Sequence, residues 1–496
     1  MTIHLSILLF FPLVLGAFGG LAPRGFAPST LLVGSLVSLI YAVLLLLEFD
    51  TGAAGLQFVT SDAWIDDLGV RYSLGVDGLN LWLVALTALL FAVAALWITL
   101  RPPDRPKLYV FHLGVAETGV LGALLAQDLL LFVLFFDLML VPFYFLIGQW
   151  GGGDRVGATF KLVVYTLVGS LLMLAAAVAT GVTAGAGAEG GLSFDIAALA
   201  EAPVESSTQQ WIFVAFALAF LIKMGAFPLH GWMPDGYRAM PLPVLAVFSG
   251  VLSKVAAYGF LRVVLPVFPD AAQEFETVML ILAVLSILYG SAQAFTQTNV
   301  RLILGYSSMA QLGFIMLGIF ALGQAAGAQG ALLQMVNHGL VVAPLCFIVA
   351  LLHERTGSDD LREMGGAALR APVLSALFLV VALATLAIPG SANFAGEFLI
   401  LLGVFNAKLA LAIIASTGVA LASVYMLRAF IRAMHNRLRG GTGSYDLSVR
   451  DGLVLVPLVV LIVAFGVYPQ QALEHSQATV ERVVAAPAAV AREASP

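Results

Sequence analysis

Five ionisable side chains of this chain lie inside strongly apolar stretches, where burying a charge is costly. Asp137 lies within LLLFVLFFDLMLVPFYFLIG and Lys223 within LAFLIKMGAFPLHGW, while Lys254, His338 and Glu397 lie in three further apolar stretches. A lysine can lose its proton when it is desolvated, whereas an arginine effectively never does. Acids, lysines and a histidine at such depth can load and release protons, so the chemistry that these residue types predict is proton transfer along a buried file.

Two interpretations of these buried charges are open. If Asp137 and Lys223 approach each other, each offsets the cost of desolvating the other, and Lys254 takes the next position along the file. The alternative is a set of static ion pairs that fix helix packing. Five ionisable groups at intermediate depth favour the proton path, because charged residues inside membrane spans usually mark ion pathways.

Other polar residues are weaker candidates. Lys161, near the end of an apolar stretch, either extends its ammonium to the membrane surface or feeds protons inward. His230 follows Pro228 and either bonds carbonyl groups freed by that proline or acts as a relay. We interpret Asp128 as a loop charge and Glu117 as local polarity at a span interface.

The composition identifies a membrane protein. Apolar residues make up 61% of the 496 residues and charged residues only 10%, against roughly 25% charged residues in soluble domains. The sequence contains no long basic run that would indicate nucleic-acid binding. The single cysteine, Cys346, cannot hold an iron–sulfur cluster, and no paired histidines on facing spans suggest haem. GGGDR at 151–155 precedes no phosphate-loop lysine and reads as a turn.

Apolar stretches of sufficient length predict about fourteen membrane-spanning helices. The opening MTIHLSILLFFPLVLGAFGG lacks a basic start and a cleavage site, so we expect a first span and not a cleaved signal. The expected limits are 3–20, 28–48, 78–100, 108–126, 128–150, 157–182, 208–228, 240–265, 276–296, 300–322, 328–352, 371–403, 408–434 and 451–469.

Charges in the connections alternate along the chain. The odd-numbered connections are basic and the even-numbered ones are acidic or neutral, which by the positive-inside rule puts the odd connections in the cytoplasm and both termini on the outer side. The basic residues of the odd connections are Arg24, Arg101, Arg105, Lys107, Arg155, Arg238, Arg301, Arg355, Arg362, Arg370, Arg432, Arg437, Arg439 and Arg450; acids of the even connections include Asp62, Asp66, Asp67, Glu189, Asp195, Glu201 and Glu205.

Proline and glycine interrupt two of the expected spans. The seventh contains Gly225 and Pro228, and the twelfth contains Pro389, Gly390 and Gly396. The two spans run in opposite directions, which is typical of an inverted repeat with broken helices at corresponding positions. We therefore expect an all-α polytopic membrane protein with two inverted five-helix repeats. Its parts would be 1–107 with helices 1–3, 108–265 as the first half, 266–434 as the inverted second half, and 435–496 with the last helix and a C-terminal tail.

Several motifs resemble the antiporter-like membrane subunits of respiratory complex I, and look most like the M-type chains of bacterial NADH–quinone oxidoreductases. These motifs are LAFLIKMGAFPLHGWMPD, SKVAAYGFLR, NVRLILGYSSMAQLGF, HERTG…LREMGG and IPGSANFAGEF, in matching order between about residues 70 and 470. The resemblance implies fourteen spans with inverted repeats. It also implies proton-path roles for Asp137, Lys223 and Lys254, and for Glu397, the acid typical of M-type chains where sister subunits have lysine.

The chain departs from this family at three places. Asp137 stands where a glutamate is usual, so it is one methylene shorter. Gln311 stands where a histidine is common, and an amide cannot titrate. QTNVRL lacks the usual acid and lysine ahead of Arg301. The first two departures alter residues of the expected proton path. The third removes the acid and the lysine on which a conformational switch ahead of Arg301 would depend.

The expected function is proton translocation in the inner (plasma) membrane, coupled to quinone reduction in other subunits. The chain itself would carry no cofactor; the resemblance implies FMN, iron–sulfur clusters and quinone in partner subunits, with two sister antiporter-like chains and other membrane-arm subunits as neighbours. The alternatives are a cation/proton antiporter subunit without redox coupling, and a passive structural subunit.

Overall fold

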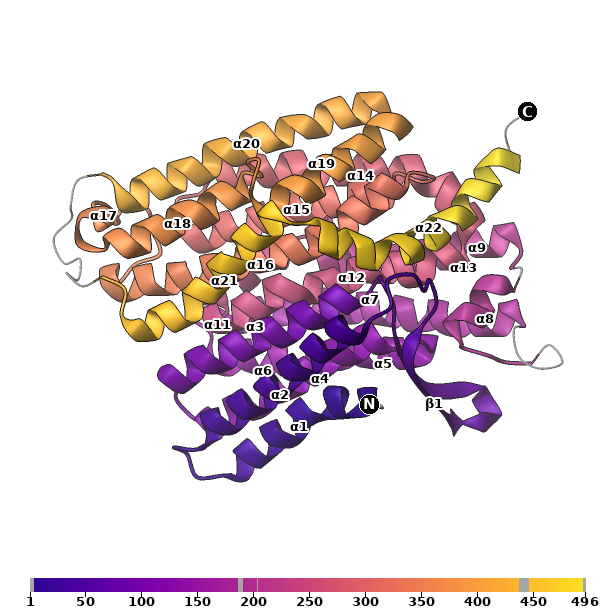
Figure 1. Ribbon diagram of the computed structural model, residues 1–496, viewed down its shortest axis with the longest axis horizontal. Coiled ribbons are helices and arrows are strands. Elements are labelled where there is room, and N and C mark those ends of the chain that lie inside the picture. The colour runs from indigo at the N-terminus through magenta and orange to yellow at the C-terminus, as the bar shows by residue number, and fades with distance from the viewer. Residues whose placement is uncertain (1–3, 186–190, 203, 437–445, 494–496) are drawn as a thin grey trace.

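The computed structural model describes residues 4–185, 191–202, 204–436 and 446–493. Most of this part of the chain is helical, as expected, and the helices run side by side in one elongated bundle (Figure 1). Glu189, Arg437 and Arg439, which belong to the expected charge pattern, lie outside the described residues.

Helices occupy each of the expected spans. Within the described residues, twelve are long and apolar enough to cross a membrane; the first expected span holds a 17-residue helix and the twelfth a pair of shorter ones. In chain order these helices are α1 (Leu5–Leu21), α2 (Ala27–Glu48), α3 (Leu81–Leu100), α4 (Pro106–Leu125), α5 (Leu129–Leu138) with α6 (Val141–Trp150), α7 (Arg155–Ala184), α9 (Ser206–Met224), α11 (Leu242–Val247) to α13 (Leu265–Val267), α14 (Pro269–Thr296), α15 (Val300–Ile319), α16 (Ala325–Thr356), α18 (Pro372–Thr385) with α19 (Ala392–Ala407), α20 (Leu409–Met434) and α21 (Val449–Val467).

The seventh and twelfth spans are interrupted, as the sequence predicts. Helix α9 ends at Gly225, whose φ of 67° is left-handed, a conformation that glycine adopts without steric cost. The chain then passes Pro228 and re-enters a helix at α10 (Met233–Ala239). In the twelfth span the break covers residues 386–391. Gly396, expected in this break, lies inside α19, where it allows close packing: an added Cβ would lie 2.4 Å from the Gln334 side chain.

Two further interruptions were not expected from the sequence. The fifth span is divided into α5 and α6, because Pro142 at the start of α6 has no N–H to donate to the preceding turn. The eighth span contains two π-helical turns, η3 (Phe248–Leu252) and η4 (Phe260–Val264), which flank α12 (Ser253–Gly259). Turns of this kind are rare and often occur at functional sites. Lys254 lies in the short α-helical segment between them.

The expected all-α fold is confirmed, with one addition that the sequence analysis did not predict. The second connection contains an antiparallel hairpin of β1 (Gln57–Ile65) and β2 (Val70–Val76). The alternating, β-branched residues of β2 could have indicated it. A short helix, α8 (Ile196–Glu201), lies in the sixth connection, and the segment treated as a C-terminal tail contains the long helix α22 (Gln470–Glu493). Figure 1 shows the hairpin and α8 near one end of the bundle, with α22 reaching toward that end.

The odd-numbered connections gather at one end of the bundle. Arg101 of the third connection pairs with Glu354 at 2.9 Å and with Asp451 at the start of α21. Arg301 and Asp359, from the ninth and eleventh connections, pair at 2.7 Å. The structure therefore places these basic connections on one face, which is the arrangement that the charge alternation requires.

The innermost helices are the eighth span and α16. Their most apolar 18-residue windows are completely buried, whereas only a third of the windows of α2, α7, α20 and α21 is buried. The outer helices expose large apolar side chains such as Leu171 and Ile413, as a lipid-facing surface requires. Lys254 and His338 thus lie on the two helices that are farthest from lipid.

Candidate functional site

Asp137 lies in the last turn of α5, immediately before the interruption of the fifth span. Its Oδ1 accepts a hydrogen bond from the Ser170 hydroxyl of α7. Ser170 was not singled out from the sequence. The hydrogen bond from Ser170 lowers the cost of burying Asp137 in an apolar span, because a hydrogen-bonded carboxyl costs less to bury than an isolated one.

Lys223 lies in the last turn of α9, just before Gly225, and is buried. Its Nζ donates to the Phe136 carbonyl oxygen at 3.0 Å and lies 4.1 Å from the centre of the Phe136 ring. The structure therefore places the Lys223 ammonium against Phe136, the residue that precedes Asp137 in the sequence. The side chains of Lys223 and Asp137 themselves form no ion pair within 4.0 Å. Aromatic and carbonyl contacts hold the ammonium without neutralising it.

Lys254 is buried in α12, and its Nζ donates to the Ser249 carbonyl oxygen of the preceding π-helical turn. The Ser249 hydroxyl accepts from the Tyr237 hydroxyl at 2.8 Å and lies 3.1 Å from the Ser308 hydroxyl of α15. Hydroxyl groups both donate and accept, so this cluster can pass a proton as well as hold one.

Glu397 lies in the first turns of α19, after the break of the twelfth span, and is buried. Its Oε1 accepts from the Gln311 amide at 2.9 Å and from the Gln334 amide at 3.5 Å, and Gln334 also donates to Gln311 at 2.7 Å. Gln311 therefore contacts the acid directly although it cannot titrate. Gln334 was missed, and its position one helical turn before His338 could have revealed it.

Unpartnered polar atoms concentrate between α16 and α19. Five such atoms are buried and make no hydrogen bond with any residue that the structure describes: His338 Nδ1, Asn337 Oδ1 and Gln334 Oε1 on α16, and both polar side-chain atoms of Asn393 on α19. Buried polar atoms in proteins nearly always have partners, and ordered water supplies them where the chain does not. This region, which joins His338 to Glu397, is thus chemically suited to hold water.

Two secondary candidates lie away from this core. Lys161 pairs with Asp235 at 2.5 Å, and 53% of its side chain is exposed, so it belongs to the surface of the bundle and not to the buried file. His230 is half-buried in the break of the seventh span, where its ring stacks on Phe227 and lies 4.9 Å from the Tyr289 ring.

Two buried acids differ from their sequence-based interpretation, and a third was not singled out from the sequence. Glu117 lies in the middle of α4, fully buried, and accepts from the Ser35 hydroxyl at 2.6 Å. Asp128 is a buried cap of α5 that accepts from three backbone N–H groups. Asp77 is buried at the start of the third span. Among the described residues, no three His, Cys, Asp or Glu side chains are grouped to hold a metal ion.

Comparisons with known proteins agree with this architecture. Residues 126–422 match the family model described as NADH:quinone oxidoreductase/Mrp antiporter, TM. The chain is 35% identical to NADH-quinone oxidoreductase subunit M of Rhodobacter capsulatus over 94% of this chain and 93% of that protein. The chain belongs to the NADH:quinone oxidoreductase/Mrp antiporter family. The M-type resemblance inferred from the motifs is thereby confirmed.

Solved structures of this family share the fold. A chain of respiratory complex I from Thermus thermophilus with bound NADH superposes with a TM-score of 0.87 at 30% identity, covering 97% of this chain and all of that one. A chain of the Mrp complex from Dietzia sp. gives a TM-score of 0.83 at 21% identity over 97% of this chain and 98% of that one, which shows likeness of fold alone. The NADH:quinone oxidoreductase/Mrp fold thus extends over nearly the whole chain.

Proposed function

We propose that this chain is a proton-translocating membrane subunit of an NADH–quinone oxidoreductase. The quinone chemistry takes place in other subunits, which carry FMN, iron–sulfur clusters and the quinone site. Neighbouring membrane-arm subunits include two sister antiporter-like chains, and the complex resides in the inner (plasma) membrane with both termini of this chain on the outer side. The identity to M subunits along nearly the whole chain supports this assignment.

The proposed proton path runs through Asp137, Lys223, Lys254, His338 and Glu397. The observation that carries it is the burial of the last four on adjoining central helices, with hydroxyl, amide and unpartnered polar atoms around them. Residues 108–265 and 266–434 form its two halves. Lys161, expected on a secondary proton path, is exposed and paired with Asp235. Its role is therefore limited to taking up protons at the surface of the bundle.

Coupling would act through charge. Because an opposite charge nearby favours the protonated form of a lysine, a change on Asp137 alters the proton affinity of Lys223. Moving one charge against the membrane potential requires about 2.3 kcal/mol per 100 mV. Rearranging a charge pair in a partly dry interior involves energies of about that size or larger.

The test is Lys254→Met in the whole complex, reconstituted in proteoliposomes. We expect fewer protons pumped per NADH oxidised, because methionine keeps the packing of lysine but carries no proton. The matched control is Lys408→Met, a lysine at the start of α20 that pairs with Glu276 at 3.2 Å, outside the file. If Lys254→Met leaves the proton-to-electron ratio unchanged, the proposed path is wrong.

A cation/proton antiporter without redox coupling is the second candidate, because the matching family model includes Mrp antiporters. It predicts that vesicles containing the complex exchange sodium for protons in the absence of NADH and quinone. Proton pumping that requires NADH and is indifferent to a sodium gradient would favour the oxidoreductase.

A further inference from the structure

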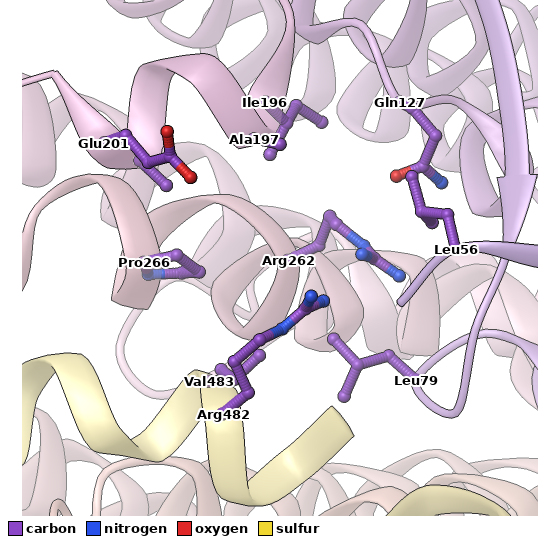
Figure 2. Close-up of a pocket in the computed structure, with 11 residues that line it drawn as sticks. Leu56, Leu79, Gln127, Ile196, Ala197, Glu201, Arg262, Pro266, Arg482 and Val483 are labelled. Atoms are coloured by element: carbon purple, nitrogen blue, oxygen red, sulfur yellow. The ribbon is translucent and has the colours of Figure 1, made fainter. Parts of the chain in front are cut away.

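A cavity of about 340 Å³ opens near the end of the eighth span. Figure 2 shows the guanidinium groups of Arg262 and Arg482 directed toward its interior, with the Gln127 amide on one side and the Glu201 carboxylate on the other. Arg262 is buried, whereas Glu201 and Arg482 are exposed. The cavity therefore joins a buried charge to the surface of the bundle.

The lining of this cavity comes from one face of the membrane domain. Leu56 belongs to the second connection, Gln127 to the fourth and Ile196–Glu201 to the sixth, while Pro266 ends the eighth span and Arg482 lies on α22. All these connections are even-numbered and lie opposite the basic odd-numbered ones. The cavity consequently faces the side that the charge pattern assigns to the outside.

A polar stripe leads from Lys254 to this cavity. Lys254, Tyr258 and Arg262 follow one another at intervals of four residues, so they lie along one face of the helix. Arg262 Nε donates to the Tyr258 hydroxyl at 2.8 Å, and that hydroxyl donates to the Leu124 carbonyl at 3.0 Å. The Lys254 ammonium bonds the Ser249 carbonyl, so a proton passes to Tyr258 only when the flexible lysine stem turns or water bridges the two side chains.

At the end of the stripe lies an acid, Asp77, that has one carboxylate oxygen without a hydrogen-bond partner among the described residues. Asp77, at the start of the third span, pairs with Arg262 at 2.5 Å through Oδ1, and both side chains are buried. Its Oδ2 is buried and has no hydrogen-bond partner in the described part of the chain. A carboxylate with one free oxygen beside a cation can accept a proton without leaving its partner.

We propose that this cavity is the outward mouth of a proton branch that leaves Lys254 through Tyr258 and the Arg262–Asp77 pair. The inference rests on the proposed function and adds an outlet separate from Glu397. The Lys254 ammonium gives one proton through water to the Tyr258 oxygen. The Tyr258 hydroxyl turns away from the Leu124 carbonyl and passes its own proton through water to the free Oδ2 of Asp77. Asp77 does not line the cavity itself, so it releases that proton to water that enters beside Arg262, which does. The Glu201 carboxylate is the last acceptor before the bulk, and Arg262 stays protonated throughout.

The competing explanation is that the Arg262–Asp77 pair only locks the third and eighth spans together. The Arg262–Asp77 ion pair of such a lock forms without the Tyr258 hydroxyl, which adds one hydrogen bond to Arg262, and without an open cavity. Variants of these two features therefore separate the explanations, and they leave the buried ion pair itself intact.

The first experiment compares Tyr258→Phe with Tyr109→Phe in the reconstituted complex. Tyr109 is a buried tyrosine of α4 whose ring packs on Trp150, away from the stripe. We expect Tyr258→Phe to lower the protons pumped per NADH toward the Lys254→Met value, while Tyr109→Phe pumps normally. A normal ratio in Tyr258→Phe overturns the outlet.

The second experiment closes the cavity chemically. Cys346 is buried, so Ala197→Cys, on the exposed lining, provides an accessible thiol in this chain. Labelling with a charged trimethylammonium methanethiosulfonate should lower the proton ratio more than labelling with a methyl reagent. The control is Ala63→Cys on β1, exposed and outside the cavity. An unreactive Ala197→Cys, or a labelled one that pumps normally, overturns the proposal.

These outcomes separate the outlet from the function on which it rests. If Lys254→Met reduces pumping but Tyr258→Phe and the plugged cavity do not, the outlet is wrong and the proposed function stands. If Lys254→Met pumps normally, the proposed function itself fails.

Discussion

The ammonium of Lys223 is held by the backbone carbonyl of Phe136, at 3.0 Å, and not by the neighbouring carboxylate of Asp137. The carboxylate is instead bound by the Ser170 hydroxyl. An acid and a lysine that are adjacent but unpaired can form or break a contact with a small rotation of their side chains. This arrangement is suited to a switch, because two states differ by one contact.

The length of the acid should decide how easily that contact forms. In Asp137→Glu the carboxylate gains one methylene and reaches farther toward Lys223, so we expect pumping to persist at or near the normal ratio. In Asp137→Asn the charge is lost and the proton affinity of Lys223 no longer responds, so the ratio should fall. Proton-to-electron ratios in proteoliposomes measure both. Equal pumping by all three proteins would show that the charge at this position has no role.

Gln311 offers a direct test of the amide beside Glu397. Gln311→His introduces a group that titrates near neutral pH. Below about pH 6 the imidazolium would pair with the Glu397 carboxylate and hinder proton release, so pumping should decline as pH falls between about 8 and 5. Gln311→Asn is the control, because it keeps an amide and should show no new dependence. A variant whose pH profile matches the original chain would contradict the proposed contact.

The unpartnered atoms of Asn393 provide a test of hydration near Glu397. Asn393→Leu keeps nearly the same volume but removes both polar atoms, so water should be held less firmly between His338 and Glu397. We expect a lower proton ratio with normal assembly. Thr166→Val is the control, since Thr166 is a buried residue on α7 whose hydroxyl bonds only its own helix. Fewer ordered waters in a cryo-EM map of Asn393→Leu would support the explanation.

Arg301 should contribute to stability more than to pumping. It donates to Asp359 at 2.7 Å and to the Met240 carbonyl at 2.7 Å, and so ties α15 to the eleventh connection and to the start of the eighth span. Arg301→Ala should destabilise the subunit by about 2–3 kcal/mol, because hydrogen bonds of a charged group are lost. Thermal unfolding of the purified complex would measure it. Unchanged thermal stability would show that these contacts contribute nothing.

The sequence alone determined which residues are embedded and where the spans lie. Hydrophobic length, the positions of proline and glycine, and the alternation of charge are local properties, because each helix in a bilayer must satisfy its own backbone. For the same reason the breaks at Gly225 and at Pro389–Gly390 were predictable. The family motifs then assigned Lys254 and Glu397 to a proton path before any contact was known.

Only the tertiary structure decided which polar atoms meet. Ser170, Gln334, Tyr258 and Asp77 act through partners far along the chain, and the spacing within one helix carries no information about the facing helix. The burial of Glu117 and Asp128 likewise depends on neighbouring helices, so the sequence pattern alone indicates only interface polarity for Glu117 and a loop charge for Asp128. The π-helical turns around Lys254 arise from packing in the fully enclosed eighth span, where tertiary contacts and not local preference select the backbone.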